Sequence, residues 1–250
     1  MDVIVLGGGL MGTASAFFLA RRGLRVTLIE RAHIGAGATV ASFGNIRRTG
    51  RYLPQLPLAH RSREIWGEAE KLLGRDVEFR ATGHIRLVFD EAARHVMRTF
   101  IADAKPWGLD LEELDAADLA RRFPYFSRQA IGASFSPKDG SANPRLIAPA
   151  FAEAARKAGV TLIDHAGNCT VRKTAEGFEV TTTKGMFAAD RLLNCAGAWG
   201  AGLAATFNEY VPLVARGPQM GVTEPLPFKI SPVVGAWSTD PGGDCYFRQV

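Results

Sequence analysis

The chain has 250 residues, of which 47% are hydrophobic and 22% are charged, so a disordered or fibrous protein is excluded. The net charge of +5 comes from arginines spread along the chain, and no basic run indicates nucleic-acid binding. Three well-separated cysteines form neither a disulfide framework nor a metal motif. No apolar segment is long enough to span a bilayer and no signal peptide precedes the first predicted strand, which together predict a cytoplasmic protein.

The first 30 residues carry the clearest motif. Val3 to Leu6 is a continuous apolar run, as expected of a buried parallel strand. The glycines of a G-x-G-x-x-G motif then follow at Gly7, Gly9 and Gly12. Such glycines permit a tight turn, the approach of a pyrophosphate to the backbone and close packing of a helix on the strand. A helix that ends at Gly23 and a second strand, Arg25 to Ile29, complete a βαβ unit.

Glu30 follows the second strand directly, where a carboxylate accepts the two hydroxyls of an adenosine ribose. The βαβ unit therefore predicts a site for a dinucleotide, either NAD or FAD. Glu30 argues against NADP because it would repel the extra phosphate, although the neighbouring Arg31 weakens this argument.

The next segment, residues 33–45, is rich in small side chains and shows no periodicity. A flexible linker is one interpretation, but its place after the second strand favours backbone that lies close to a cofactor. Ser42 is then a candidate for a phosphate, and Gly44 and Asn45 are candidates to face a ring. Four arginines follow within a short distance: Arg47, Arg48, Arg51 and Arg61. The planar fork of arginine suits a carboxylate or phosphate, so a substrate anchor, solvated surface charge and contact with cofactor phosphates all stay open.

The remaining pattern alternates between helices and strands. Helices are predicted at 58–73, 91–104, 115–123 and 143–158, with Asp90, Asp115 and Asn143 as N-caps. A strand or hairpin is predicted at 79–89, and strands are predicted at 131–135, 160–163, 169–172, 178–183, 186–189, 191–194, 211–223 and 245–250. Because strand 191–194 ends in a glycine turn, Asn194 to Gly200 is expected to approach the same cofactor crevice.

Taken together, these motifs resemble the flavoproteins of the D-amino-acid oxidase superfamily, especially its sarcosine oxidases, glycine oxidases and bacterial D-amino-acid dehydrogenases. The likeness covers nearly the whole chain. Besides the first βαβ unit, it rests on Ser42-Phe-Gly-Asn-Ile-Arg-Arg, Leu56-Pro-Leu-Ala-His-Arg-Ser, Thr82-Gly-His, Asn143-Pro-Arg-Leu, Asn194-Cys-Ala-Gly-Ala-Trp and Arg216-Gly.

The resemblance implies FAD as the cofactor and assigns two kinds of site residue. Active-site roles are implied for Arg47 and Arg51. Cofactor contacts are implied for Gly7, Gly9, Leu10, Met11, Gly12, Glu30, Arg31, Ser42, Gly44, Asn45, Ile46, Val171, Ala196, Gly197 and Trp199.

The reaction implied is oxidation of the C–N bond of a small amino acid or N-alkyl amino acid, of the D-amino acid, glycine or sarcosine type, by hydride transfer to flavin N5. A noncatalytic flavin-binding fragment or subunit that needs a partner is the alternative, and an NAD-dependent dehydrogenase is a third. The identity of the amine, the electron acceptor and any partner subunit stay open.

The fold expected is therefore α/β, with a doubly wound Rossmann-like FAD-binding domain and an inserted α+β substrate domain. The βα alternation resumes at Asn143, so the FAD-binding domain is predicted at 1–79 and 143–210, and the substrate domain at 80–142 and 211–250. The family implied by the resemblance runs to greater length, and the last residues lie inside a predicted strand, so the chain is expected to be truncated at the C-terminus.

Overall fold

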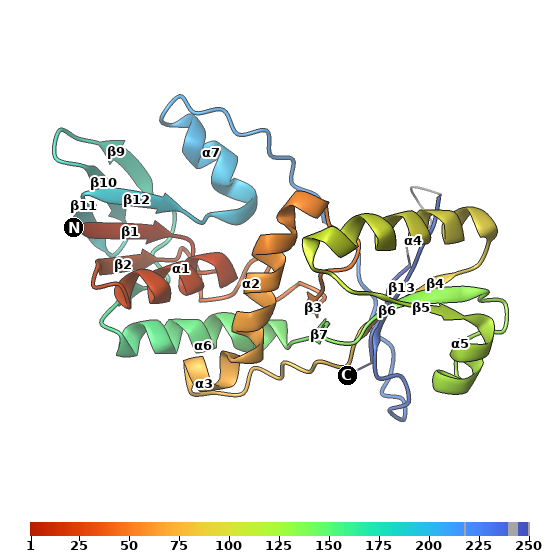
Figure 1. The fold of residues 1–250 in the computed structure, drawn as a ribbon. Coiled ribbons are helices and arrows are strands. Elements are labelled where there is room, and N and C mark those ends of the chain that lie inside the picture. Colours follow the sequence, from red (N-terminus) through yellow and green to blue (C-terminus); the bar gives the residue numbers. More distant parts are fainter. Residues whose placement is uncertain (218, 240–244, 250) are drawn as a thin grey trace. The chain divides into compact units, whose positions relative to one another are not determined.

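The computed structural model describes residues 1–217, 219–239 and 245–249 (Figure 1). The chain forms two compact units. The first comprises Met1–Phe43, Glu70–Val77 and Asn143–Met220, and the second comprises Gly44–Ala69, Glu78–Ala142 and Gly221–Val250. No helix in the described ranges is both long enough and apolar enough to cross a bilayer.

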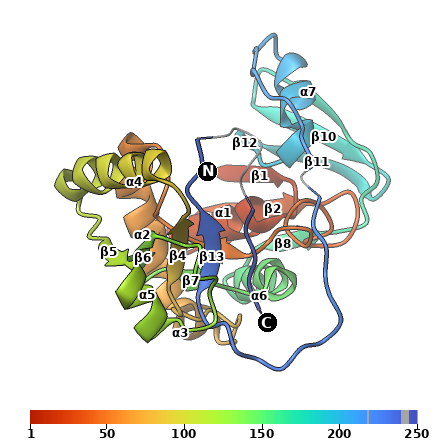
Figure 2. The ribbon, with the colours of Figure 1, turned by 90° about the vertical axis from the view of Figure 1, so that its right-hand side faces the viewer.

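A parallel four-stranded sheet in the order β12-β1-β2-β8 is the centre of the first unit (Figure 2). Its strands are β1 (Asp2–Leu6), β2 (Arg25–Ile29), β8 (Thr161–Ile163) and β12 (Arg191–Asn194). Helix α1 (Leu10–Ala20) connects β1 to β2, and α6 (Pro144–Lys157) precedes β8. The two helices pack on one another, with the rings of Phe17 and Phe151 5.8 Å apart. These elements confirm the predicted doubly wound arrangement.

A second sheet packs on the same core. It is antiparallel, in the order β11-β10-β9, and consists of β9 (Thr170–Lys173), β10 (Phe178–Thr182) and β11 (Gly185–Ala189). Ile4 and Leu6, two residues apart on β1, share a core cluster with Val180 of β10. Because side chains alternate along a strand, Val3 and Val5 point to the opposite face, so β1 is buried on both sides. The unit ends with η3 (Gly197–Trp199) and α7 (Gly200–Ala205).

The second unit is built on a mixed sheet in the order β13-β4-β6-β5, with β13 running parallel to β4 (Figure 2). Its strands are β4 (His84–Val88), β5 (Glu112–Asp115), β6 (Gly132–Ser136) and β13 (Val233–Ala236). Helices α4 (Glu91–Ala104) and α5 (Ala116–Arg122) carry the predicted caps, since Asp90 accepts the Ala93 N–H at 2.7 Å and Asp115 accepts the Asp118 N–H at 2.7 Å. The short helix η2 (Lys105–Trp107) follows α4.

Residues 44–69 belong to the second unit, whereas the predicted boundaries place them in the first domain. Strand β3 (Asn45–Ile46) pairs with β7 (Gly140–Ser141), and Leu56 lies in a core cluster with Ala104 and Leu109. Nonlocal pairing and packing of this kind leave no signal in the local pattern of 44–69.

Three other segments differ from expectation. The helix predicted at 58–73 is broken at Glu68 into α2 (Leu56–Gly67), preceded by η1 (Leu53–Gln55), and α3 (Ala69–Leu73). The strand predicted at 79–89 is limited to β4. Within the described residues of 211–223 and 245–250 there is no regular strand, and only Phe247 forms an isolated bridge, with Val234. Residues 218 and 250 of these two predictions lie outside the described residues.

Candidate functional site

Three glycines line the turn between β1 and α1, and the structure distinguishes their roles. A Cβ on Gly7 would lie 2.2 Å from the Cys195 carbonyl oxygen, and one on Gly12 would lie 1.7 Å from the Gly7 carbonyl oxygen. These two glycines are therefore required by the packing of the turn itself. A Cβ on Gly9 would meet only the Thr39 hydroxyl, at 3.2 Å. The described residues thus leave the space beside Gly9 open, as a close approach of pyrophosphate requires.

Helix α1 presents its N-terminus at this turn. No side chain caps it and its first turn carries no acidic residue. The Leu10 N–H donates to the Thr39 hydroxyl at 2.9 Å, whereas Met11 and Gly12 follow in the first turn, where N–H groups have no intrahelical acceptor. The end of α1 is therefore suited to an anion. The sequence motif did not single out Thr39, because its contact with Leu10 spans 29 residues.

Glu30 lies at the carboxyl end of β2 with its carboxylate held by the backbone. Its Oε2 accepts the Gly8 N–H at 2.6 Å, and its Oε1 accepts the Ala32 N–H at 2.9 Å. An ionised carboxylate has about four acceptor positions, so both oxygens keep capacity for hydroxyl donors. The structure thus places an oriented acceptor next to the glycine turn.

The second predicted anchor follows β12. Gly197 adopts φ +56°, and the Asn194 side chain closes the turn by donating to the Gly200 carbonyl at 2.8 Å. Trp199 is 55% exposed, and the Arg31 guanidinium lies 3.8 Å from the centre of its ring. Arg31 and Trp199 are therefore brought together from distant parts of the sequence.

Two further predicted cofactor residues, Val171 and Ala196, also lie in the first unit. Val171 packs its side chain into the core on β9, an edge strand of the antiparallel sheet whose outer backbone is not paired with another strand of that sheet. Ala196 follows β12, and its N–H donates to Asn194 Oδ1 at 3.2 Å. Of the run from Ser42 to Ile46, Ser42 belongs to the first unit and Gly44, Asn45 and Ile46 to the second.

The residues of the first unit fit the ADP half of FAD. The cradle beside Gly9 is open, the N-terminus of α1 favours the pyrophosphate, and Glu30 offers acceptors for the ribose.

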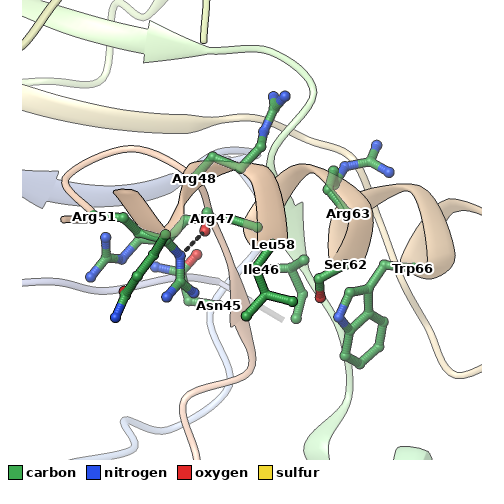
Figure 3. A pocket seen from close by; sticks show the side chains of 11 residues that line it. Asn45, Ile46, Arg47, Arg48, Arg51, Leu58, Ser62, Arg63 and Trp66 are labelled. Carbon is green, nitrogen blue, oxygen red and sulfur yellow. Dashed lines mark hydrogen bonds between the residues drawn. The ribbon is translucent and has the colours of Figure 1, made fainter. Parts of the chain in front are cut away.

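A cavity of about 350 Å³ lies wholly within the second unit (Figure 3). One wall is the segment around β3 and the other is a face of α2. Four arginines, Arg47, Arg48, Arg51 and Arg63, contribute to the lining. The remaining lining residues are Asn45, Ile46, Gln55, Leu58, Ala59, Ser62 and Trp66. Among the described lining residues there is no carboxylate.

Arg48 is neutralised by Asp139, whose side chain is fully buried. Asp139 Oδ1 accepts from Arg48 Nε at 2.7 Å, and its Oδ2 accepts the Arg48 N–H at 2.9 Å. The Arg48 guanidinium also contacts Ser136 and His60. Arg48 thus has a structural role that the cluster of arginines in the sequence did not reveal.

The two arginines predicted to be catalytic, Arg47 and Arg51, lie together at the cavity. Arg51 Nε donates to the Arg47 carbonyl at 2.9 Å, and the Arg47 guanidinium donates to the Thr49 carbonyl. Beside them the buried Asn45 Oδ1 has no hydrogen-bond partner among the described residues. Arg47, Arg51 and the unpartnered oxygen of Asn45 therefore line the same cavity.

His84 was not predicted as a site residue, yet it is 3% exposed on β4 and its Nδ1 finds no partner in the described part of the chain. Burial lowers the pKa of His84 to about 4, with the positive charge of Arg47 as the next cause. The imidazole is consequently neutral at physiological pH.

We expect this shifted pKa to make stability depend on pH. An unfolded histidine, with a pKa near 6.5, binds a proton between pH 6.5 and pH 4 that folded His84 does not bind, so the free energy of unfolding falls as the pH drops through this window. From pH 7 to pH 5 the His84 contribution to this loss is about 2 kcal/mol. Urea unfolding at pH 7 and at pH 5 measures this loss in the free energy of unfolding.

The variant His84→Leu should lose that part of the pH dependence. His95→Leu, at an exposed position on α4, is the matched control and should keep the wild-type slope. An unchanged slope in His84→Leu would show that His84 does not titrate in this way.

A family model described as FAD dependent oxidoreductase matches residues 2–250. Glycine oxidase from Geobacillus kaustophilus strain HTA426 is 30% identical over 212 residues, which cover 82% of this chain and 56% of the oxidase. Monomeric sarcosine oxidase from Bacillus sp. strain B-0618 is 28% identical over 217 residues, covering 85% of this chain and 55% of that enzyme.

The solved structures agree with the sequence relatives. The crystal structure of glycine oxidase from Geobacillus kaustophilus superposes with a TM-score of 0.78 at 29% identity, covering 83% of this chain and 58% of that one. The chain thus spans about half the length of the curated relatives it matches.

Proposed function

Because the chain belongs to the family of FAD-dependent oxidoreductases, we propose that it oxidises the C–N bond of a small amino acid or N-alkyl amino acid. The glycine oxidase and sarcosine oxidase relatives support this class of substrate. The observation that carries the proposal is the pair Arg47 and Arg51 at one cavity with no carboxylate in its described lining. We assign the first unit to the ADP half of FAD and the second unit to the substrate.

In this proposal the protein residues bind and orient the cofactor and the substrate. The backbone beside Gly9 and the N-terminus of α1 hold the pyrophosphate, while Glu30 binds the ribose. Arg47 and Arg51 hold the substrate carboxylate through charge-assisted hydrogen bonds, which fixes the orientation of the α-carbon. The flavin, when bound, supplies the two-electron acceptor that no amino-acid side chain offers. His84 stays neutral and adds no charge to the site.

The visible absorption spectrum tests the proposal most directly. FAD added to the purified chain should bind, and its absorption should bleach when a suitable amino acid is added without oxygen. D-amino acids, glycine and N-methyl amino acids form the panel. A chain that keeps its flavin oxidised with every amine would instead support a noncatalytic flavin-binding subunit, and a chain that takes up NAD and stays colourless would support a nicotinamide enzyme.

Replacing Arg51 tests the carboxylate anchor. Arg51→Gln should lower kcat/KM for an amino-acid substrate by about 30-fold, because a hydrogen bond to a charged group contributes about 1.5–3 kcal/mol. Steady-state kinetics measure the effect, and far-ultraviolet circular dichroism checks the fold. Arg61→Gln is the control. Arg61 is exposed on α2, pairs with Glu64 at 2.8 Å and is not among the described residues that line the cavity. Equal kinetics for wild type and Arg51→Gln would remove Arg51 from the anchor.

A further inference from the structure

Arg31 and Trp199 start from opposite sides of the glycine turn (Figure 2). In the parallel sheet of the first unit, β1 lies between β2 and β12, and all three strands run in the same direction. Their carboxyl ends therefore lie at one edge of the sheet. The glycine turn follows β1, Arg31 follows the end of β2 closely, and Trp199 lies in η3 beyond β12. The two residues thus flank the turn to which the pyrophosphate is assigned.

The two side chains meet across this turn. The central carbon of the Arg31 guanidinium lies 3.8 Å from the centre of the Trp199 ring, a distance typical of a close cation–π contact. The strands on either side of β1 are about 10 Å apart, because neighbouring strands in a sheet are spaced by about 4.8 Å. A contact between residues that follow β2 and β12 therefore crosses the carboxyl end of β1, beside the glycine turn.

The backbone holds both residues in place, whereas their side chains lie at the surface. The Arg31 carbonyl accepts the Gly167 N–H at 3.0 Å, and the Trp199 N–H donates to the Ala196 carbonyl at 3.1 Å. Arg31 is exposed, and Trp199 is 55% exposed. The two side chains are consequently presented from fixed positions and stay accessible to a ligand.

The exposure of Trp199 indicates a role other than packing. A cation–π contact between two exposed groups adds little to the stability of a fold, because water competes for both groups. Fold stability therefore does not explain a large aromatic side chain that is exposed at this edge of the sheet. A ligand that covered the pair would bury the indole ring and would strengthen the contact by removing water from it.

We propose that the Arg31–Trp199 pair closes over the adenosine half of FAD and slows its release. Glu30, the residue before Arg31, offers its carboxylate to the ribose, so the adenosine lies at this end of the site. Bound FAD leaves only after the pair opens. The inference rests on the proposed FAD site of the first unit, and it is independent of the substrate that is oxidised.

The rate at which FAD leaves the chain tests the proposal without turnover. The chain loaded with FAD is mixed with a large excess of ADP, which fills each emptied site, and the fluorescence of the released FAD gives the dissociation rate. Arg31→Met keeps the length of the side chain without its charge, and Trp199→Leu removes the ring. Each variant should raise the dissociation rate by about tenfold, because a cation–π contact is strongest where water is excluded.

The double variant Arg31→Met, Trp199→Leu distinguishes a pair from two independent contacts. It should release FAD about as fast as the faster single variant, because either change alone already breaks the pair. Two independent contacts would instead multiply, giving an increase of about 100-fold.

Arg21→Met is the matched control. It removes an exposed cation–π contact, with the Phe17 ring at 5.6 Å, at the opposite end of α1, and it should keep the wild-type dissociation rate. Thermal unfolding of every variant without FAD checks the fold. A purely structural role of the pair would lower the unfolding temperature and leave the release of FAD unchanged, which would overturn the proposal.

The remaining outcomes separate the pair from the FAD site itself. If the wild-type chain binds FAD and both single variants release it at the wild-type rate, the pair is overturned and the FAD site of the first unit stands. The same holds if the effects multiply in the double variant. If the wild-type chain binds no FAD, the proposed site of the first unit is lost and the role of the pair with it.

Discussion

Gly9→Val should abolish retention of FAD while leaving the fold of the first unit intact. Gly9 has φ −72° and ψ −175°, which valine also adopts, and its Cβ would meet only the end of the Thr39 side chain. The new side chain occupies the space that the pyrophosphate needs. Losing even two charge-assisted backbone hydrogen bonds, at about 1.5–3 kcal/mol each, should raise the Kd for FAD by at least about 100-fold.

Flavin fluorescence during titration with FAD measures the Kd, and thermal unfolding of the chain without FAD checks the fold. Gly202→Val is the matched control, since a Cβ there has no neighbour within 4 Å. Gly12→Val should behave differently and unfold the unit, because its Cβ would lie 1.7 Å from the Gly7 carbonyl oxygen. A Gly9→Val protein that binds FAD like the wild type would show that the cofactor does not pass this turn.

The first βαβ unit could be predicted from the sequence because its signals are local. The apolar run of β1, the spacing of the glycines and Gly23 at φ +81° just beyond α1 each report on a few neighbouring residues. The caps of α4, α5 and α6 are local in the same sense, and all three are confirmed. The comparisons confirm the family and the cofactor that the motifs implied.

Elements defined by distant partners could not be predicted. Strand β13 has only four residues in a segment rich in proline and glycine, and it exists because it pairs with β4, about 150 residues away in the chain. Conversely, Val214 and Val222 lie in a segment with strand-like composition, yet they are 78% and 96% exposed. Their apolar side chains find no sheet in the described residues, so composition alone was misleading.

The candidate site likewise contains residues that local sequence signals reveal and residues that only long-range contacts reveal. The three glycines of the motif lie at the turn between β1 and α1, as predicted, whereas the arginine cluster looked uniform in the sequence. Arg47, Arg48 and Arg51 all line the cavity, but the structure shows that Arg48 also pairs with the buried Asp139. His84 and Thr39 could not be found from sequence, since their significance comes from burial and from a long-range contact. The roles of Arg47 and Arg51 in binding substrate stay predictions.

Asp139→Ala should strongly destabilise the second unit and disorder the arginine wall of the cavity. Asp139 is fully buried. Its carboxylate accepts hydrogen bonds from the Arg48 guanidinium, from the Arg48 backbone N–H and, at 3.5 Å, from the Thr49 hydroxyl. Its loss leaves the charge of Arg48 unpaired at a side chain that is only 11% exposed. Removing one partner of a buried ion pair costs about 3–5 kcal/mol, which is a large share of the stability of a typical domain.

Urea unfolding measures the loss, and the matched control is Glu113→Ala, which removes an exposed pair with Arg98 and should cost less than about 1 kcal/mol. The double variant Arg48→Met, Asp139→Leu should be more stable than Asp139→Ala, because it removes both charges and leaves neither one buried alone. If Asp139→Ala costs no more than Glu113→Ala, the pair does not organise this wall. If it costs the full amount and the double variant recovers stability, then the Arg48–Asp139 pair is what holds this wall of the second unit together.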